Sequence, residues 1–354
     1  MPSSKPFVSF IIPTLNAASV LEPCLKSITS QDYPKKKIEI IIADGGSTDD
    51  TLTIAKKYAA KIVKNPLKTG EAGKAVGVKA ARGDITAFID SDNILPSSSW
   101  LKKMLIPFSD PQITASEPIK YTYRKKDPFL TRYFALLGMN DPICLFTGNY
   151  DRHCILTNKW TNLNFPSQNK KNYLKITLNK TSIPTIGANG FLIKRATLPP
   201  IGNYLFDIDI LINLIKDHSS EVTRRGSSDG GIRPQGIHIA KVKTGIIHTF
   251  VEDSFLKFFK KQTRRINDMS YHQAQKNRSI NWQQDFFWKV IYFQLQCLLI
   301  FPIIYQTLKG LTKSRDWCFL SHPIAVYSTL LIYLYNWVKG KINPAQSDRS
   351  NWKQ

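Results

Sequence analysis

The chain has 354 residues, enough for one large domain or two modest ones that each bury a core. Lysine and arginine number 49 against 26 aspartates and glutamates, and the net charge of +23 favours anionic partners such as phosphates, nucleic acid or a negatively charged membrane surface. The five cysteines lack any Cys-x-x-Cys spacing, which favours reduced thiols over a disulfide framework. Pro13 ends the first apolar run too early for a secretory signal, so we expect a cytosolic main body.

Short apolar runs alternate with helix-like stretches in the first third of the chain. The runs rich in Ile, Val and Phe predict buried strands at 7–12, 38–43 and 85–90. The stretches between them predict helices at 19–30 and 51–60. This alternation predicts an α/β layer with mainly parallel strands, in which ligands bind beyond the carboxyl ends of the strands.

Aspartates directly follow two of these predicted strands. Asp44, in "ADGGSTDDT", follows the predicted strand at 38–43. Asp90, in "FIDSDN", is the last residue of the predicted strand at 85–90, and Asp92 comes two residues later. Two carboxylates so close suit a hard divalent cation, since Mg²⁺ takes one or two carboxylates together with substrate phosphates. The alternative for both loops is purely structural: a turn whose polar side chains cap the segment that follows.

The middle of the chain is less regular. The polar, glycine-rich run "SSEVTRRGSSDGGIRPQG" (219–236) predicts a loop. The aromatic and apolar run 128–146 is too short to span a membrane, and it predicts a core helix, with an acceptor groove or a membrane-touching surface as alternatives.

Two apolar segments near the end of the chain, 286–308 and 317–338, predict helices roughly 33–35 Å long, enough to cross a bilayer. Pro302 and Pro323 are expected to break them. A spanning hairpin would place the basic connector 309–316 outside, against the positive-inside tendency, whereas re-entrant or interfacial helices keep every cation on one side. We favour membrane contact over a soluble helical hairpin. Tryptophans suited to interfacial anchoring stand near the segment ends at Trp288, Trp317 and Trp337.

The order of the N-terminal motifs resembles a known family. "VSFIIPTLN", "CLKSITSQDYP", "IEIIIADGGSTDDT" and "AARGDITAFIDSDN" follow one another across about the first 100 residues as in the nucleotide-binding half of glycosyltransferase family 2. The resemblance implies a GT-A fold: an α/β domain with a Rossmann-like nucleotide-binding half and an acceptor half. We therefore expect a nucleotide-sugar-binding half at 1–115, an acceptor-binding half at 116–270, and membrane-associated helices with a basic tail at 271–354.

The same resemblance implies inverting transfer of a sugar from a nucleoside diphosphate donor, such as a UDP- or GDP-sugar. It places Pro13, Thr14 and Asn16 along the nucleotide and Asp44 at the base. Lys74, in "GEAGKAVG", falls where the family has a basic residue and would contact the diphosphate. A solvated helix lysine is the alternative for Lys74.

For the metal, the resemblance implies Asp90 in the ribose and metal shell and Asp92 as a ligand of Mg²⁺ or Mn²⁺. His248, at the end of an apolar run, stands about where several family members carry a histidine that reaches the metal or phosphate. A structural histidine is the more common alternative. Arg265 lies in "KKQTRRI", which keeps the Gln-x-x-Arg spacing of processive synthases but has Ile266 in place of tryptophan. Arg265 would contact the diphosphate, and a basic helix face beside the membrane is the alternative.

Inverting transfer needs a carboxylate that deprotonates the acceptor hydroxyl. "NYLFDIDIL" resembles the family's Glu-Asp-x-Asp-Leu motif, with Phe206 in place of the first acid and Asp207 in the position of the base. The alternative is that Asp207 and Asp209 are acids at the start of a helix, where a negative charge is favourable.

The combined hypothesis is a metal-dependent hexosyltransferase at the cytoplasmic face of the membrane, acting on a lipid or glycan acceptor in cell-envelope polysaccharide or glycolipid biosynthesis. A nucleotidyltransferase, or a basic membrane-binding protein that has lost catalysis, are the alternatives. Nucleic acid is not an expected partner, because the cations are spread along the chain and no recognised binding module is present.

Overall fold

The computed structural model describes residues 5–179, 183–187, 189–224, 236–251, 254–275, 278–279 and 283–342. The chain divides into two compact units, and each is described by itself. The sheet unit comprises Met1–Ile119, Leu163–His248 and Gln354. The helical unit comprises Lys120–Asn162 and Thr249–Lys353.

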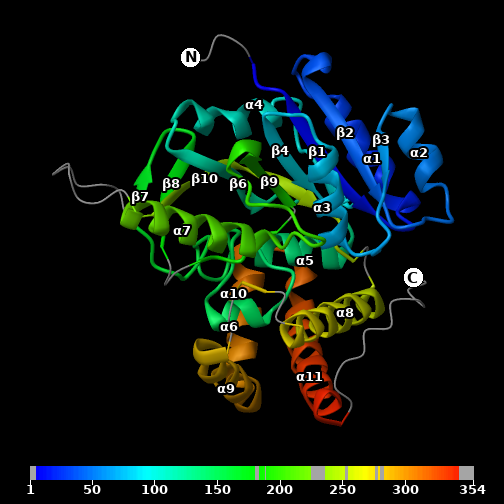
Figure 1. The fold of residues 1–354 in the computed structure, drawn as a ribbon. Helices are drawn as coiled ribbons and strands as arrows, with labels where there is room; N and C mark the ends of the chain where they lie inside the picture. The colour runs from blue at the N-terminus through cyan, green and yellow to red at the C-terminus, as the bar shows by residue number, and fades with distance from the viewer. Residues whose placement is uncertain are drawn as a thin grey trace. The chain divides into compact units, whose positions relative to one another are not determined.

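The sheet unit is built on one mixed sheet of ten strands in the order β3-β2-β1-β4-β9-β6-β10-β8-β7, with β5 paired to β10 (Figure 1). The strands are β1 (Val8–Thr14), β2 (Ile38–Asp44), β3 (Lys61–Lys64), β4 (Ile85–Ile89), β5 (Asn93–Ile94), β6 (Ile113–Tyr121), β7 (Ser167–Asn169), β8 (Tyr173–Leu178), β9 (Asn189–Lys194) and β10 (Ile237–His248). Strands β3, β2, β1 and β4 are parallel, and antiparallel pairing begins where β9 joins β4. The predicted α/β class with a mixed sheet is confirmed.

The parallel strands β1, β2 and β4 are rich in apolar residues because both of their faces are covered. All five residues of β4 are buried, and so are the last five of β2. The predicted strands at 7–12, 38–43 and 85–90 are confirmed to within two residues at each end. The register pairs Thr14 with Asp44, so the carboxyl ends of β1 and β2 stand level.

Five α-helices accompany the sheet among the described residues of this unit. They are α1 (Ala18–Thr29), α2 (Thr51–Lys57), α3 (Gly70–Ala80), α4 (Trp100–Leu105) and α7 (Asp207–Arg224). Short 3₁₀ turns occur at Lys35–Lys37, Ile106–Ser109 and Arg195–Thr197. The helices predicted at 19–30 and 51–60 are confirmed as α1 and α2. The loop predicted at 219–236 was placed too early, because α7 continues to Arg224; residues 225–235 lie outside the described part of the chain.

Helix α3 lies unusually close to β1 because glycine faces the strand twice, one helical turn apart. A Cβ at Gly73 would come within 2.7 Å of the Pro13 side chain, and one at Gly77 within 2.3 Å of Ile11 Cγ2. Only hydrogen fits at these positions. The close approach fixes the position of Lys74 next to Gly73.

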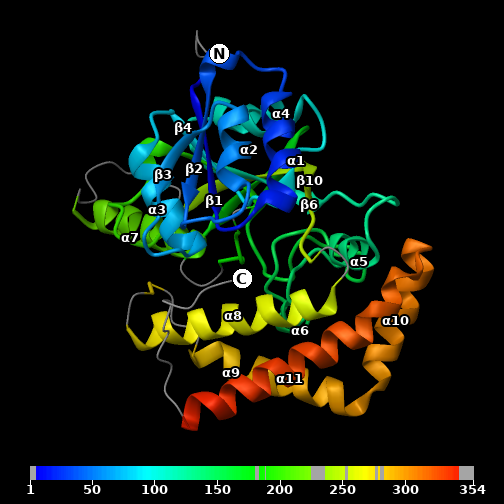
Figure 2. The same ribbon diagram turned by 90° about the vertical axis from the view of Figure 1, so that its right-hand side faces the viewer.

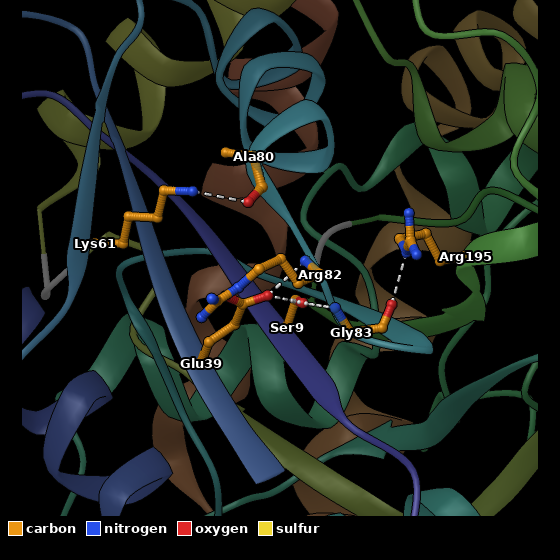
Figure 3. A network of polar contacts seen from close by, with 7 residues as sticks. All are labelled: Ser9, Glu39, Lys61, Ala80, Arg82, Gly83 and Arg195. Atoms are coloured by element: carbon orange, nitrogen blue, oxygen red, sulfur yellow. Dashed lines mark hydrogen bonds and ion pairs between the residues drawn. The ribbon is translucent and has the colours of Figure 1, made fainter. Parts of the chain in front are cut away.

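A polar network holds the opposite, amino ends of the parallel strands (Figure 3). Glu39, at the start of β2, accepts hydrogen bonds from Ser9 Oγ (2.5 Å) and from the Arg82 backbone N–H (2.6 Å). The Gly83 N–H donates to Ser9 Oγ (2.8 Å), and Arg195 Nε donates to the Gly83 carbonyl (2.8 Å). This network ties the turn before β4 to β1, β2 and the end of β9, and it lies at the edge of the sheet where ligands do not bind.

The helical unit contains α5 (Phe129–Leu137), α6 (Ile143–Thr147), α8 (Phe255–Ala274), α9 (Gln283–Leu299), α10 (Phe301–Ser314), the 3₁₀ turn Trp317–Leu320 and α11 (Ser321–Ile342). Helix α8 packs along α11 (Figure 2). The run predicted as a core helix at 128–146 forms two helices, α5 and α6, separated by Gly138 in the left-handed conformation. Buried residues from both helices contribute to the core, among them Leu130, Tyr133, Phe134 and Leu145.

The two apolar segments differ from each other. The first is bent by 83° between α9 and α10, so the predicted break near Pro302 is confirmed. The predicted break at Pro323 is wrong: Pro323 lies in the first turn of α11, where a missing N–H breaks no helical hydrogen bond. In the described part of the chain, Trp317–Asn336 is long and apolar enough to cross a membrane, and half of its most apolar stretch is buried in the protein.

Candidate functional site

The carboxyl ends of β1 and β2 hold Asp44 in a closed set of hydrogen bonds. Its Oδ1 accepts from Thr14 Oγ1 (3.0 Å) and Ser47 Oγ (2.5 Å). Its Oδ2 accepts from the backbone N–H groups of Gly46 (2.8 Å) and Ser47 (2.9 Å). A carboxylate has about four acceptor positions, and two of the four donors here are hydroxyls that can rotate away. Asp44 can therefore accept a hydrogen bond from a ligand by exchanging a hydroxyl partner.

Asn16 links the end of β1 to the loop after β2. Its backbone takes the left-handed conformation (φ 47°), which asparagine tolerates better than most residues. Its N–H donates to Ser47 Oγ (2.9 Å), and its Oδ1 accepts from the Thr48 N–H (2.8 Å). The predicted nucleotide residues Thr14, Asn16 and Asp44 thus form one connected loop system.

The turn after β4 brings Asp92 to His248. His248 Nε2 lies 3.3 Å from Asp92 Oδ1, because His248 ends β10 and pairs in register with Asn93 of β5. Asn93 in turn donates to Asn189 Oδ1 (2.9 Å) at the start of β9, and its own Oδ1 accepts from the Asp90 N–H (3.3 Å). Three strands thereby fix the turn that carries both predicted metal carboxylates.

The structure brings two of the predicted metal residues, Asp92 and His248, into contact. Among the residues that the structure describes, no group of three His, Cys, Asp or Glu side chains could hold a metal ion by itself. Asp92 and His248 nevertheless present a carboxylate oxygen and an imidazole nitrogen to each other at 3.3 Å. Mg²⁺ is usually bound by one or two carboxylates and completes its coordination with substrate phosphates and water.

Lys74 and Asp207 form a buried ion pair. Lys74 Nζ lies 2.5 Å from Asp207 Oδ2, and the two side chains are 6% and 9% exposed. Lys74 is therefore not a solvated helix lysine. The other carboxylate oxygen, Asp207 Oδ1, is buried and has no hydrogen-bond partner among the described residues. An unsatisfied buried acceptor is costly, which marks it as a position for a ligand's hydroxyl or for water.

Burial raises the pKa of Asp207 to about 6 in spite of the opposing effect of Lys74, and the charge of Asp90 raises it further. Burial alone would lower the pKa of Lys74, but the charges of Asp207, Glu71 and Asp90 raise it overall. Asp90 thus acts electrostatically on both members of the pair. The predicted base, the predicted diphosphate lysine and one predicted metal carboxylate lie in one electrostatic environment.

Asp207 and Asp209 also occupy the first turn of α7, as the structural alternative expected. The two interpretations do not exclude each other, since a helix N-terminus stabilises a carboxylate that also contacts Lys74. Phe206, where the family has an acid, stacks on Tyr204 with ring centroids 6.1 Å apart.

Pro13 and Arg265 complete the set of predicted residues. Pro13 is part of β1 and packs against α3 at Gly73. Arg265 belongs to α8 in the helical unit, where its guanidinium lies 5.4 Å from the ring centroid of Phe250. Its role at the diphosphate stays a prediction.

Three further residues support the site and were not predicted from the sequence. Ser47 holds both Asp44 and Asn16, and the Asn93–Asn189 pair joins the β4 turn to β9. The only sequence signal is positional: Asn93 is the last residue of "SDN", and Asn189 stands in the "GANG" run at the start of β9.

Comparison with known proteins finds matches in the first half of the chain. Residues 9–178 match the sequence model of the family described as "Glycosyl transferase family 2". Glycosyltransferase AglE of Haloferax volcanii is 31% identical over 146 residues, which cover 39% of this chain and 48% of AglE. A dolichyl N-acetyl-alpha-D-glucosaminyl phosphate glycosyltransferase of Methanococcus voltae, which transfers a diacetamido-dideoxy-glucuronosyl group, is 35% identical over 119 residues, 32% of this chain and 36% of that protein. The alignments thus span less than half of each relative.

A solved structure shares the fold. The mannosyltransferase PcManGT of Pyrobaculum calidifontis, solved with GDP-Man and Mn²⁺, superimposes with a TM-score of 0.52. The superposition covers 96% of this chain and 89% of PcManGT at 16% sequence identity. At that identity the likeness establishes the GT-A architecture.

Proposed function

We propose that this chain, whose residues 9–178 match the model of glycosyltransferase family 2, transfers one sugar from a nucleoside diphosphate sugar to an acceptor hydroxyl, with Asp207 as the general base. The observation that carries the proposal is the buried Lys74–Asp207 pair, which is influenced by the charge of Asp90.

Asp207 has the properties of a base that works near neutral pH. Its pKa of about 6 leaves it mainly ionised at pH 7 while keeping it basic enough to take a proton in the transition state. The acceptor oxygen would donate its proton to Asp207 Oδ1 and form a bond to the anomeric carbon. The bond from that carbon to the nucleoside diphosphate breaks on the opposite face, and the sugar is transferred with inversion.

Lys74 links donor binding to the base. A diphosphate competes with Asp207 for the lysine ammonium, since both are anions that accept charge-assisted hydrogen bonds. When the donor draws Lys74 toward its phosphates, Asp207 loses its partner and becomes a stronger base. This arrangement favours proton abstraction only in the presence of donor.

Asp92 and His248, with Asp90 in the same turn, would hold a divalent cation together with the donor diphosphate. Bound Mg²⁺ or Mn²⁺ would neutralise the charge that develops on the departing diphosphate. PcManGT was solved with GDP-Man and Mn²⁺, which supports a related donor and ion for this chain. Thr14, Asn16 and Asp44 would contact the nucleoside.

We propose a lipid-linked or membrane-proximal acceptor on the cytoplasmic face of the membrane. The Methanococcus voltae relative is named for a dolichyl-linked acceptor. The apolar helices of the C-terminal region and the net charge of +23 support contact with an anionic lipid surface. The described cysteines are all free, as a reducing compartment requires.

The proposal is tested by release of nucleoside diphosphate from a panel of UDP-, GDP- and dTDP-sugars with Mn²⁺ or Mg²⁺. We expect one donor to turn over and chelation of the metal to stop the reaction. Asp92→Ala should reduce turnover at least about a hundredfold, because the leaving group loses its stabilising ion. Asp50→Ala, in the exposed loop before α2, is the control. Equal turnover in wild type and Asp92→Ala would contradict the metal assignment, and pyrophosphate as the product would indicate a nucleotidyltransferase.

A further inference from the structure

Resting on the proposed membrane acceptor, we infer that the helical unit enters one leaflet of an anionic bilayer through the corner between α9 and α10, without crossing it. Figure 2 shows the two helices meeting at this corner. Ile300 is the residue between them.

The corner exposes four successive apolar residues. The exposed fractions of Leu298, Leu299, Ile300 and Phe301 are 75%, 62%, 55% and 83%. A helix lying on a protein surface exposes residues three or four apart, so four in a row mark a projecting corner. Large apolar side chains this exposed, in one contiguous group, indicate an interaction surface.

The backbone at the corner is specifically built for the bend. Ile300 has φ 59° and ψ −46°, a conformation that is strained for a β-branched residue. Pro302 follows in the first turn of α10, where proline is well tolerated. The bend therefore persists because the surrounding packing fixes it, with Cys297 and Ile303 buried on either side.

The bend sets the depth that the corner can reach. The arms Trp288–Leu299 and Phe301–Ser314 are each about 18–21 Å long at 1.5 Å per residue. If both arms make the same angle with the membrane normal and the corner points into the bilayer, the 83° bend places the corner about 12–14 Å deeper than the outer ends of the arms. One leaflet of hydrocarbon is about 15 Å thick, half of the bilayer core. The corner matches a single leaflet and falls short of a full crossing.

Helix α11 is long enough to span, but its inner face is occupied by protein. Near the start of α11, the His322 ring forms hydrogen bonds with Tyr133 Oη (2.8 Å) and Gln306 Oε1 (2.9 Å). Tyr333 donates to Asp141 (3.0 Å) toward its end. Among the described side chains of α11 and of the turn before it, the exposed apolar residues form one stripe, comprising Leu320, Ile324, Leu331, Leu334, Tyr335 and Val338.

The neighbour of α11 argues against a crossing. Helix α8 packs along α11 and carries exposed cations at Lys257, Lys260 and Arg264. If α11 crossed the bilayer, these charges would be drawn toward hydrocarbon, where each charged side chain is unfavourable. An α11 that lies along the interface, with its apolar stripe toward the lipid, avoids this cost.

Lysine and arginine are absent from 290–308, on both sides of the corner, and Lys309 is the cation nearest to it in the second arm. Lys289 follows the exposed Trp288, whose side chain is 71% exposed, at the outer end of the first arm. Lys313 and Arg315 end the second arm, and Lys339 lies near the end of α11. In a one-leaflet arrangement all of them meet the same headgroup layer, which complements anionic lipid.

The first test is vesicle binding by the purified full chain, measured by co-sedimentation. We expect binding to vesicles of phosphatidylglycerol and phosphatidylcholine and weaker binding to phosphatidylcholine alone. Phe301→Glu should weaken binding at least about tenfold, because the most exposed apolar side chain of the corner no longer enters hydrocarbon. Ile106→Glu, an exposed apolar residue of the sheet unit, is the matched control. Equal loss in both variants, or no binding by wild type, would overturn the inference.

The second test is sidedness in sealed membrane vesicles. K36C, R315C and K339C variants are each labelled with a membrane-impermeant maleimide, with the wild type as the blank for the native cysteines. One-leaflet insertion predicts that all three label from the same side. Labelling of R315C and K339C from opposite sides would show that α11 spans the bilayer. Neither assay needs sugar transfer, so failure of the proposed activity would leave these results unchanged. A stable dimer of wild type that Phe301→Glu dissociates, without vesicle binding, would instead show that a second copy covers the corner.

Discussion

Asp207 combines three properties that a single structural role does not require. It is buried, it is paired with a lysine, and one of its oxygens lacks a hydrogen-bond partner among the described residues. A carboxylate that served only to begin α7 would be stable at the surface, where the helix N-terminus and water solvate it. A role of Asp207 in proton transfer explains its burial beside Lys74 better.

The pKa of Asp207 gives a prediction about pH. Because burial raises it to about 6, the carboxylate takes up a proton as the pH falls through 6, and the protonated form cannot act as a base. We expect kcat/KM to be nearly constant from pH 7 to 8 and to fall about tenfold per pH unit well below 6. Initial-rate measurements at low donor and acceptor concentrations report this free-enzyme pKa. A profile that stays flat down to pH 4.5 would remove Asp207 from the role.

Lys74 is predicted to act on both donor affinity and the base. In Lys74→Met, Asp207 stays buried without its cation, so its pKa rises and the acid limb of the kcat/KM profile moves to higher pH. The KM for donor should rise at least about tenfold as well, because one charge-assisted contact to the diphosphate is lost. Lys74→Arg retains the charge and should recover much of both effects. A Lys74→Met enzyme with an unshifted pH profile would separate the lysine from the base.

At the scale of elements, the distance between α3 and β1 determines where Lys74 lies. Gly77→Ala places a methyl group where Ile11 Cγ2 would be 2.3 Å away, so the helix or the strand must shift. We expect a loss of about 1–3 kcal/mol in the free energy of unfolding, measured by urea titration. Gly70→Ala in the same helix has no atom within 4 Å of the new Cβ and should cause no loss. Equal stability of the two variants would show that the close approach is not required.

The elements nearest the N-terminus could be predicted well because their signals are local. Strands β1, β2 and β4 are continuous apolar runs, and the aspartates that end two of them identified one edge of the sheet. The bend at Ile300 could be anticipated only from Pro302, and its angle could not. Pro323 shows the limit of the same rule, since the sequence does not reveal whether a proline falls inside a helix or in its first turn.

At the scale of the whole molecule, the candidate site depends on contacts between distant parts of the sequence. Lys74 and Asp207 are 133 positions apart, and Asn93 and Asn189 are 96 apart. No periodicity or spacing indicates such pairs. Strands β9 and β10 return antiparallel to the parallel half and bring Asn189 and His248 to the turn that carries Asp90 and Asp92. The residue types of the site were predictable, and their pairing was not.

The net charge of +23 also acts at this scale. It raises the local concentration of anionic donors and lipids, and salt screens it over about 8 Å at physiological ionic strength. We expect vesicle binding to weaken steeply between roughly 50 and 500 mM salt. Donor turnover in detergent should change less, because salt screens the buried Lys74–Asp207 pair poorly. Parallel salt titrations of binding and turnover check this. Identical salt dependence of the two would indicate that one exposed charge cluster serves both.

The central claim is that Asp207 removes the proton of the acceptor while other residues hold the donor. The most direct test compares wild type with Asp207→Asn in two measurements. Calorimetry measures donor binding, and a single-turnover reaction with a membrane extract as acceptor measures sugar transfer. The account predicts donor affinity within about tenfold of wild type and transfer slower by about 10²–10⁴-fold in the variant. Transfer at the wild-type rate by Asp207→Asn would contradict it.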